Sequence, residues 1–193
     1  MKDIEKLTPI VHKGTQRIVT DRLVLRRFTK KDARDMYVWA SNPNVTKYLS
    51  YQPHKSIKDS KRILRKWIVS YRKQNVYNWG IEYMGVCIGN ISVVSQKENG
   101  YICHLGWQID EKHWNKGIVT ESAKAVINFL FTEVGCDRIS AACDTRNVGS
   151  ERVMQKIGMK FEDCLRRYYY QKDGSIGDRN FYAILRSEWC DKN

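Results

Sequence analysis

The sequence predicts an α/β domain in which a mixed sheet is flanked by helices, and three stretches predict it. Residues 79–109 alternate in the manner of three antiparallel strands, broken by a polar loop at 95–100. Residues 101–143 are patterned as strand, turn, helix and strand, a βαβ unit whose two strands run parallel. Residues 165–185 predict a closing hairpin around Gly174.

Length and composition predict one domain spanning 1–193, with 1–20 as a lead-in whose last residues join an edge strand. At this size roughly 70% of the unfolded surface can be buried in one core. No run of about 20 apolar residues predicts a membrane span, and the first twenty residues do not resemble a signal peptide. We therefore expect a cytoplasmic protein.

The chain is strongly basic. It has 34 Lys and Arg against 21 Asp and Glu, a formal net charge of +13. This charge predicts attraction to a polyanion: nucleic acid, an acidic protein surface or a phosphorylated cofactor. The six cysteines form no C-x-x-C pair and have no histidine at metal-binding spacing, so neither a metal site nor a disulfide framework is indicated.

The first half predicts one strand followed by two helices. Residues 22–28 are rich in Leu and Val, and Thr29 with Asp32 forms a capping-box pattern that opens a helix ending at Asn42. A second helix opens at Ser56, and its outer side is basic. That side is either a solvated helix face or a docking surface for an acidic or RNA-bearing partner. Its basic residues are Lys55, Lys58, Lys61, Arg62, Arg65 and Lys66.

The rest of the chain is organised around residues 101–121, which predict a strand, a turn and the start of a helix over 120–134. Free N–H groups and the positive dipole end at such a helix start favour a pyrophosphate. A strand over 138–143, a helix over 150–157 and a strand beginning at 159–163 follow.

Three segments carry a family resemblance, TDRLVLRRFTKKDA, LGWQIDEKHWNKGIVTESA and NVGSERVMQKIGMKFED. From Asp21 onward the chain resembles the GNAT superfamily of acetyl-CoA-dependent N-acetyltransferases, and within it the Rim-type branch, which acetylates protein N-termini and related amines. The resemblance implies a mixed, mostly antiparallel sheet of about seven strands, flanked by helices and splayed at its parallel pair to hold acetyl-CoA. By family analogy it also allows a homodimer.

The resemblance also implies which residues meet the cofactor. The family's phosphate loop, Q/R-x-x-G-x-G/A, corresponds to Trp114 through Val119, where only Gly117 matches. Val119 fits only if its side chain points away from the phosphate. Asn147 and Ser150 match the family's N-x-x-S pair, which meets the pantetheine arm. The implied cofactor contacts are Trp107, Gln108, Ile109, Trp114, Asn115, Lys116, Gly117, Ile118, Val119, Thr120, Asn147 and Ser150.

Acetyl transfer needs an unprotonated amine and a proton for the departing thiolate. Ser150 is the expected proton donor, although it could simply cap its helix. Many relatives have a glutamate in the middle of the strand where this chain has His104, so we expect His104 to be the base, with Glu82 as the alternative. The alternative is a purely structural role, in which His104 is a hydrogen-bonded strand residue. Cys103 faces the opposite, apolar side of the strand, which favours direct transfer over a cysteine relay.

The expected function is acetyl transfer from acetyl-CoA to a primary amine, first of all a protein or peptide N-terminus of the ribosomal type. Two alternatives stay open. One is acetylation of a small amine such as a polyamine, an aminoglycoside or a metabolite. The other is a non-catalytic basic module that binds RNA or the ribosome. A P-loop hydrolase is excluded because no G-x-x-x-x-G-K-[ST] motif is present.

Overall fold

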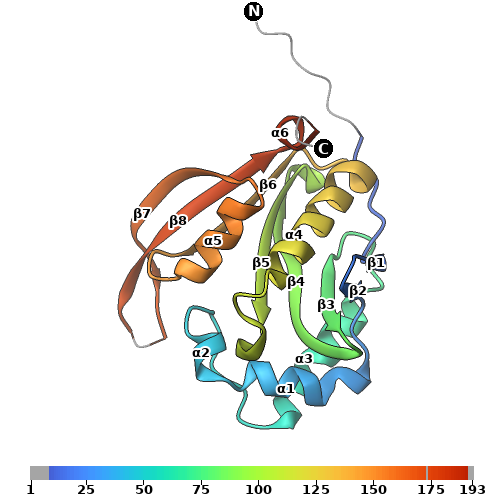
Figure 1. The fold of residues 1–193 in the computed structure, drawn as a ribbon, viewed down its shortest axis with the longest axis vertical. Helices are drawn as coiled ribbons and strands as arrows, with labels where there is room; N and C mark the ends of the chain where they lie inside the picture. Colours follow the sequence, from blue (N-terminus) through green and yellow to red (C-terminus); the bar gives the residue numbers. More distant parts are fainter. Residues whose placement is uncertain (1–8, 173, 191–193) are drawn as a thin grey trace, which may run out of the picture.

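The computed structural model describes residues 9–172 and 174–190, and Figure 1 shows their arrangement. The described elements, in chain order, are β1 (Ile18–Val19), β2 (Leu23–Arg26), the 3-10 turn η1 (Lys30–Asp32), α1 (Ala33–Ala40), α2 (Pro43–Thr46), α3 (Ile57–Ser70), β3 (Asn78–Tyr83), β4 (Val86–Lys97), η2 (Glu98–Gly100), β5 (Ile102–Ile109), η3 (Glu111–His113), α4 (Ile118–Phe129), the π-helical turn η4 (Leu130–Val134), β6 (Arg138–Asp144), α5 (Val148–Lys156), β7 (Lys160–Tyr170), β8 (Ile176–Leu185) and α6 (Arg186–Cys190).

The strands form one mixed sheet in the order β1-β2-β3-β4-β5-β6-β8-β7. Every neighbouring pair in it is antiparallel except β5 with β6, which is parallel. The predicted mostly antiparallel sheet is therefore confirmed. It has eight strands rather than about seven, because Ile18 and Val19 of the lead-in pair with β2.

The parallel pair separates part of the way along. Pairing runs from Ile102 with Arg138 to Leu105 with Ala141, after which β5 continues to Ile109 and β6 to Asp144 unpaired with each other. On its other edge β5 stays paired with β4 as far as Ile109. β4 also carries a bulge opposite this point, between its pairings with Leu105 and His104. The sheet is thus splayed between β5 and β6, as the family resemblance implies.

Helices cover both faces of the sheet (Figure 1). One hydrophobic cluster joins α4 and α5 to the strands, through residues such as Ile127 and Met154. A second cluster joins α1 and α3 to the opposite face. Alternation along β4 divides consecutive residues between them, since Cys87 lies in the second cluster and Ile88 in the first. On β5, Cys103 faces the first cluster and is buried, as predicted.

The helix starts test the capping predictions. Thr29 and Ser56 each form the predicted capping box. Helix α4 begins at Ile118, two positions earlier than predicted, behind the N-cap residue Gly117. Helix α5 begins at Val148, and the residue that caps it is Asn147, whose side-chain oxygen accepts the Ser150 N–H at 3.2 Å. The alternative in which Ser150 caps its own helix is therefore wrong.

Other boundaries differ from the prediction as well. Strand β4 extends to Lys97, into the stretch predicted as a loop, because the long β5 offers it pairing partners to that point. The predicted strand at 159–163 and the first arm of the hairpin are one strand, β7, which two register shifts bend along β8. The short helix α2 was not predicted; it starts at Pro43, the residue expected to end helical structure.

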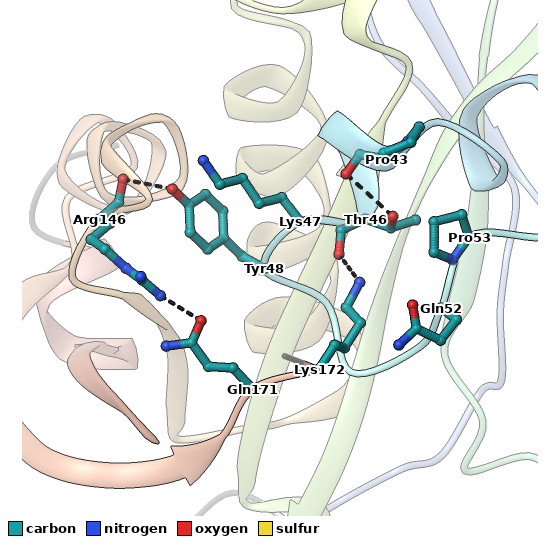
Figure 2. A pocket seen from close by; sticks show the side chains of 9 residues that line it. All are labelled: Pro43, Thr46, Lys47, Tyr48, Gln52, Pro53, Arg146, Gln171 and Lys172. Atoms are coloured by element: carbon teal, nitrogen blue, oxygen red, sulfur yellow. Dashed lines mark hydrogen bonds between the residues drawn. The ribbon is translucent and has the colours of Figure 1, made fainter. Parts of the chain in front are cut away.

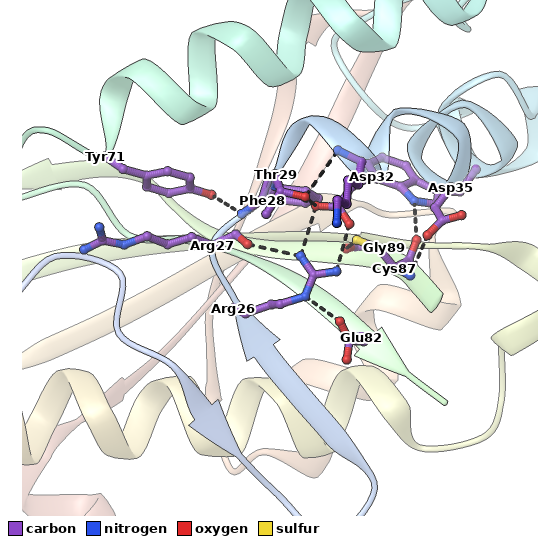
Figure 3. Close-up of polar contacts among 12 residues, drawn as sticks. Arg26, Arg27, Phe28, Thr29, Asp32, Asp35, Tyr71, Glu82, Cys87 and Gly89 are labelled. Carbon is purple, nitrogen blue, oxygen red and sulfur yellow. Dashed lines mark hydrogen bonds and ion pairs between the residues drawn. The ribbon is translucent and has the colours of Figure 1, made fainter. Parts of the chain in front are cut away.

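A half-buried arginine, Arg26, ties the edge of the sheet to α1 (Figure 3). Arg26 on β2 binds the Asp32 carboxylate with Nη1 and Nη2, at 3.0 and 2.8 Å, and Glu82 on β3 with Nε, at 2.5 Å. Asp32 also accepts the Thr29 N–H, and Asp35 of α1 accepts the Cys87 N–H at 3.0 Å. These bonds hold β2, β3, β4 and the start of α1 together.

The described part of the lead-in crosses the molecule in extended form. Val11 donates its N–H to the Val134 carbonyl, and the Thr15 hydroxyl joins the Val76 carbonyl to the Asn78 N–H. Residues 1–8 lie outside the described part of the chain. Among the described helices, none is both long enough and apolar enough to span a membrane.

Candidate active site

The open edge of β5 presents backbone groups toward the splay. The Asp110 N–H faces β4, donating to the Ile88 carbonyl at 2.8 Å. Because backbone groups alternate sides along a strand, those of Trp107 and Ile109 face away from β4, where β6 has separated. The Trp114 indole donates to the Ile109 carbonyl at 3.0 Å. The groups of Trp107 remain available, and an extended amide-containing chain can pair with them as a further strand would.

A turn at the start of α4 has a backbone geometry that suits an anion. Asn115 and Gly117 both have left-handed backbones, with φ of 59° and 73°, and the turn is exposed. The first intrahelical N–H bond of α4 is from Glu121 to the Gly117 carbonyl, at 3.0 Å. The N–H groups of Ile118, Val119 and Thr120 therefore have no acceptor within the helix. Such a helix start binds phosphate groups well.

The Val119 side chain is half-buried and packs against the main hydrophobic cluster. It thus points into the core, away from the turn, as a phosphate loop with a β-branched residue at this position requires.

Arg22 supports this turn, a role that the sequence did not reveal. Its Nη1 donates to the Lys116 carbonyl at 3.1 Å, and its Nε binds Glu121 in the first turn of α4 at 2.7 Å. Partial burial opposes ionisation of Glu121, but hydrogen bonds from Thr20 and Arg22 outweigh it and lower its pKa. Arg22 therefore offsets a carboxylate that would otherwise repel an anion here. The partners lie almost a hundred positions apart, so local patterns could not predict the contact.

The opposite wall of the splay is the start of α5. Asn147 uses its side-chain oxygen for capping, which leaves its amide NH₂ free to donate. The Ser150 hydroxyl is half-buried and has no hydrogen bond to another described residue. The starts of α4 and α5 therefore both lie beyond the carboxyl ends of the parallel strands β5 and β6. In open α/β sheets, ligands bind at this position.

His104 lies in the closed part of the parallel pair. It is paired with Ser140 across the strands, and its Nδ1 is 3.0 Å from the Ser140 hydroxyl. Burial, and next the charge of Arg179, lower the pKa of His104 to about 4. The imidazole is therefore neutral at physiological pH, and its conjugate acid is costly to form.

Glu82, the alternative base, lies on β3, two strands away from β5. Its carboxylate forms the ion pair with Arg26 described above. It belongs to the network that fastens α1 to the sheet (Figure 3). The assignment of either residue as the base stays a prediction.

A cavity of about 460 Å³ lies on the α3 side of the sheet, lined by β3, β4 and β5 and by the loop that precedes α3. A chain of polar side chains runs across it. Tyr51 donates to the Gln108 oxygen, Gln108 donates to Asn90 at 2.6 Å, and Asn90 donates to Asn78 at 3.1 Å. None of the described residues that line the cavity carries a charge. Burial raises the pKa of Tyr51 far above its usual value, so it too is neutral.

This cavity adjoins the open edge, because Gly106, Trp107 and Gln108 of β5 also line it. Gln108, predicted as a cofactor contact, thus has its side chain in the cavity. Tyr51, Asn78 and Asn90 were missed by the sequence analysis. Polar residues at buried strand positions, such as Asn78 and Asn90, were the available signal for them.

Comparison with known proteins identifies the family. Residues 22–160 match the family model described as Acetyltransferase (GNAT) domain. The chain is 31% identical over 169 residues to the uncharacterized N-acetyltransferase YoaA of Bacillus subtilis, covering 86% of this chain and 95% of the relative. A second B. subtilis relative, provisionally named ribosomal N-acetyltransferase YdaF, is 25% identical over 175 residues, 89% of this chain and 95% of the relative.

A solved structure agrees. The GNAT-family acetyltransferase of Bacillus anthracis superimposes with a TM-score of 0.80 at 27% identity, covering 90% of this chain and all of that one (100%). With the family model matched over most of the chain, and with the splayed sheet and helix-start turn in place, the assignment is direct: this chain belongs to the GNAT family of acetyltransferases.

Proposed function

We propose that the protein transfers the acetyl group of acetyl-CoA directly to the α-amino group of a protein or peptide. One observation carries the proposal. Strands β5 and β6 separate after Leu105 and Ala141, which leaves the backbone of Trp107 unpaired with β6, while the turn at Gly117 follows β5 and Ser150 follows β6. Acetyl-CoA is the donor that GNAT enzymes use, and these groups suit its pyrophosphate, its amide-containing arm and its thioester in turn.

In this mechanism the chain supplies positions and hydrogen bonds. The start of α4 binds the pyrophosphate, and the open edge of β5 aligns the arm. An N–H of Trp107 or Ile109 stabilises negative charge on the thioester oxygen. The amine attacks the carbonyl carbon, a C–N bond forms and the C–S bond breaks. Ser150 gives a proton to the departing thiolate. The proton lost by the amine then passes through solvent and reprotonates the Ser150 hydroxyl.

The uncharged cavity supports an α-amino acceptor over a polyamine. An α-amino group has a pKa near 8, against about 10.4 for a lysine-type amine, so far more of it is neutral at pH 7. A cavity lined by Asn78, Asn90, Gln108 and Tyr51 offers hydrogen bonds but no carboxylate to hold a second cation. The net charge of +13 further opposes the approach of polycations.

The basic face of α3 supports work near the ribosome, in line with the provisional name of the relative YdaF. The five Lys and Arg residues of α3, and Lys55 just before it, are all exposed, and of these only Arg62 forms an ion pair with a described residue, Asp59. Surface cations with few partners favour association with RNA-rich particles, in a manner that salt weakens.

A panel of acceptors tests the proposed function. Acetyl-CoA is mixed with unblocked peptides, spermidine and an aminoglycoside, and released thiol is measured while mass spectrometry locates the acetyl group. We expect α-amino acetylation of peptides with kcat/KM at least about 100-fold above that for spermidine, since the cavity lacks carboxylates. Peptides with a blocked N-terminus and free lysines are the control. Preference for spermidine would contradict the proposal.

Replacing Gly117 tests the phosphate turn. Gly117→Ala places a Cβ on a left-handed backbone (φ 73°), which costs about 1 kcal/mol of stability, and alters the N–H groups that face the ligand. Gly85→Ala is the matched control, because Gly85 also has a left-handed backbone (φ 79°) and open surroundings, but lies in the β3–β4 turn. By calorimetry we expect CoA to bind about tenfold more weakly to Gly117→Ala alone. Equal affinities in the two variants would argue against this binding site.

Replacing Ser150 tests the proton donor. We expect Ser150→Ala to lower kcat by about 100-fold, because general acid catalysis of thiolate departure is lost, while the Kd for acetyl-CoA changes little. Ser187→Ala in α6, where the serine is exposed, is the control and should retain wild-type kcat. A Ser150→Ala enzyme with near-normal kcat would assign the proton to water.

The low pKa of His104 predicts two pH effects. The unfolded chain binds a proton on this imidazole below about pH 6.5, whereas the folded chain does so only below about 4, so stability falls as the pH decreases between these values. The loss is about 3 kcal/mol, and in His104→Gln thermal melts should show much of this dependence removed.

The same shift makes His104 a weak base. We expect kcat/KM of His104→Gln to fall no more than about tenfold, and its acidic limb to follow the pKa of the acceptor amine as in the wild type. A loss of about 100-fold or more across the profile would instead identify His104 as the base.

A further inference from the structure

A second cavity, of about 280 Å³, lies between α2 with its following loop, the β6–α5 loop and the end of the β7–β8 hairpin (Figure 2). Of the described residues that line it, three are cationic and none is acidic. The cations are Lys47, Arg146 and Lys172, and each comes from a different segment of the chain. Such convergence of positive charge around a cavity fits an anionic group.

The three cations are positioned by other groups (Figure 2). Arg146 binds Asp144 through Nε and Nη2, at 2.8 and 2.7 Å, and also donates to Gln171 at 2.5 Å. The ring of Tyr48 lies between two of them, 5.3 Å from the Lys47 ammonium and 5.9 Å from the Arg146 guanidinium. The cavity is therefore shaped before any ligand arrives.

Two of the charges have no counter-charge among the residues that the structure describes. Lys172 donates to the Thr46 carbonyl, and neither it nor Lys47 forms an ion pair with a described carboxylate. Partial burial lowers the pKa of Lys172, a shift that an anion in the cavity would reverse. Among the described residues, Asp144 is the carboxylate that binds Arg146, and it also accepts a hydrogen bond from the Tyr169 hydroxyl.

This cavity and the uncharged cavity flank a single loop. Lys47, Tyr48 and Gln52 line the basic one, whereas the residues between them, 49–51, line the uncharged one. On the other wall, Arg146 directly precedes Asn147 at the start of α5. A molecule whose amine lies at the open edge of β5 can thus extend past this loop into the basic cavity.

We propose that the basic cavity binds an acidic side chain near the N-terminus of the acceptor, which makes the protein selective for acidic peptides. This inference rests on the proposed α-amino acetylation. An extended peptide places its second and third residues roughly 7–11 Å beyond its amine, and the two cavities lie on either side of the single loop that contains residues 47–52. A carboxylate at one of those residues would meet Lys47, Lys172 and Arg146, while the amine stays in the uncharged cavity.

The test compares three peptides that begin Ser-Ala-Ala, Ser-Glu-Glu and Ser-Lys-Lys and are otherwise identical. By thiol release we expect kcat/KM for the acidic peptide to exceed that for the neutral one by at least about tenfold, mostly through KM. The preference should shrink in 0.5 M salt, since screening weakens exposed charge pairs. In Lys47→Gln with Lys172→Gln it should nearly vanish, with the neutral peptide unaffected. Lys30→Gln, an exposed lysine of η1, is the matched control and should keep the preference.

Equal kcat/KM for the neutral and acidic peptides, or an equal loss for both in the double variant, would overturn the inference while leaving peptide acetylation intact. Binding of an N-acetylated acidic peptide, measured by calorimetry without donor, separates the two claims. If no peptide is acetylated but this ligand binds and binding needs Lys47 and Lys172, the proposed function fails and the acidic-peptide site stands. If the acetylated acidic and neutral peptides bind equally, the site is refuted.

Discussion

The structure depends on the different pairing of the two edges of β5. One edge is paired with β4 along its whole length, while the other leaves β6 after Leu105. Unpaired backbone groups inside a sheet are costly, so a strand edge of this kind persists only where its surroundings permit it. At Gly106 an added Cβ would lie 2.9 Å from Val94 in the β4 bulge, so the absence of a side chain lets the two strands stay together there. The Trp114 indole occupies the Ile109 carbonyl farther along. What remains open is the stretch around Trp107, and the proposed chemistry is placed there.

The helix starts take their positions from the same division. Helix α4 follows β5, and α5 follows β6, so two strands that separate carry two helix starts to opposite sides of one opening. A helix start can bind an anion only if nearby charges allow it. In α4 the carboxylate of Glu121 lies in the first turn. Arg22, which directly precedes β2, forms an ion pair with this carboxylate and also donates to the Lys116 carbonyl. Sheet edge, turn and ion pair are thus parts of one arrangement, the one to which the proposed function assigns cofactor binding.

Much of this arrangement could be predicted because it depends on local sequence patterns. The capping boxes at Thr29 and Ser56, the glycine that opens α4 and the alternation that buries Cys103 depend on a few neighbouring residues. The Arg22 contact and the basic cavity depend on segments about a hundred positions apart, and no local pattern records such distances. The role of Asn147 as the cap was missed because two residues at the helix start, Asn147 and Ser150, were both chemically suited to it.

His104 exposes a different limit of sequence reasoning. Its place on the strand face could be predicted, but its environment could not, because that environment combines burial with the charge of Arg179 from β8. An imidazole held neutral next to Ser140 differs from one poised to gain a proton. The family resemblance identified the position at which a base is common, whereas the desolvation around this side chain decides how strong a base it is.

The distribution of charge around the opening between β5 and β6 bears on how an acceptor would be recognised. The side of the sheet that would receive the amine contains amides, a neutral phenol and a neutral imidazole. Under the proposed function, a cationic amine would find no carboxylate among the described residues that line this cavity, and acceptors that lose their proton readily would be favoured. Three cations instead line the cavity beyond the loop, Lys47, Arg146 and Lys172. Under the two proposals, selectivity would come from binding an anionic side chain at a distance from the reacting nitrogen. The same cations would repel polyamines and attract peptides with acidic side chains.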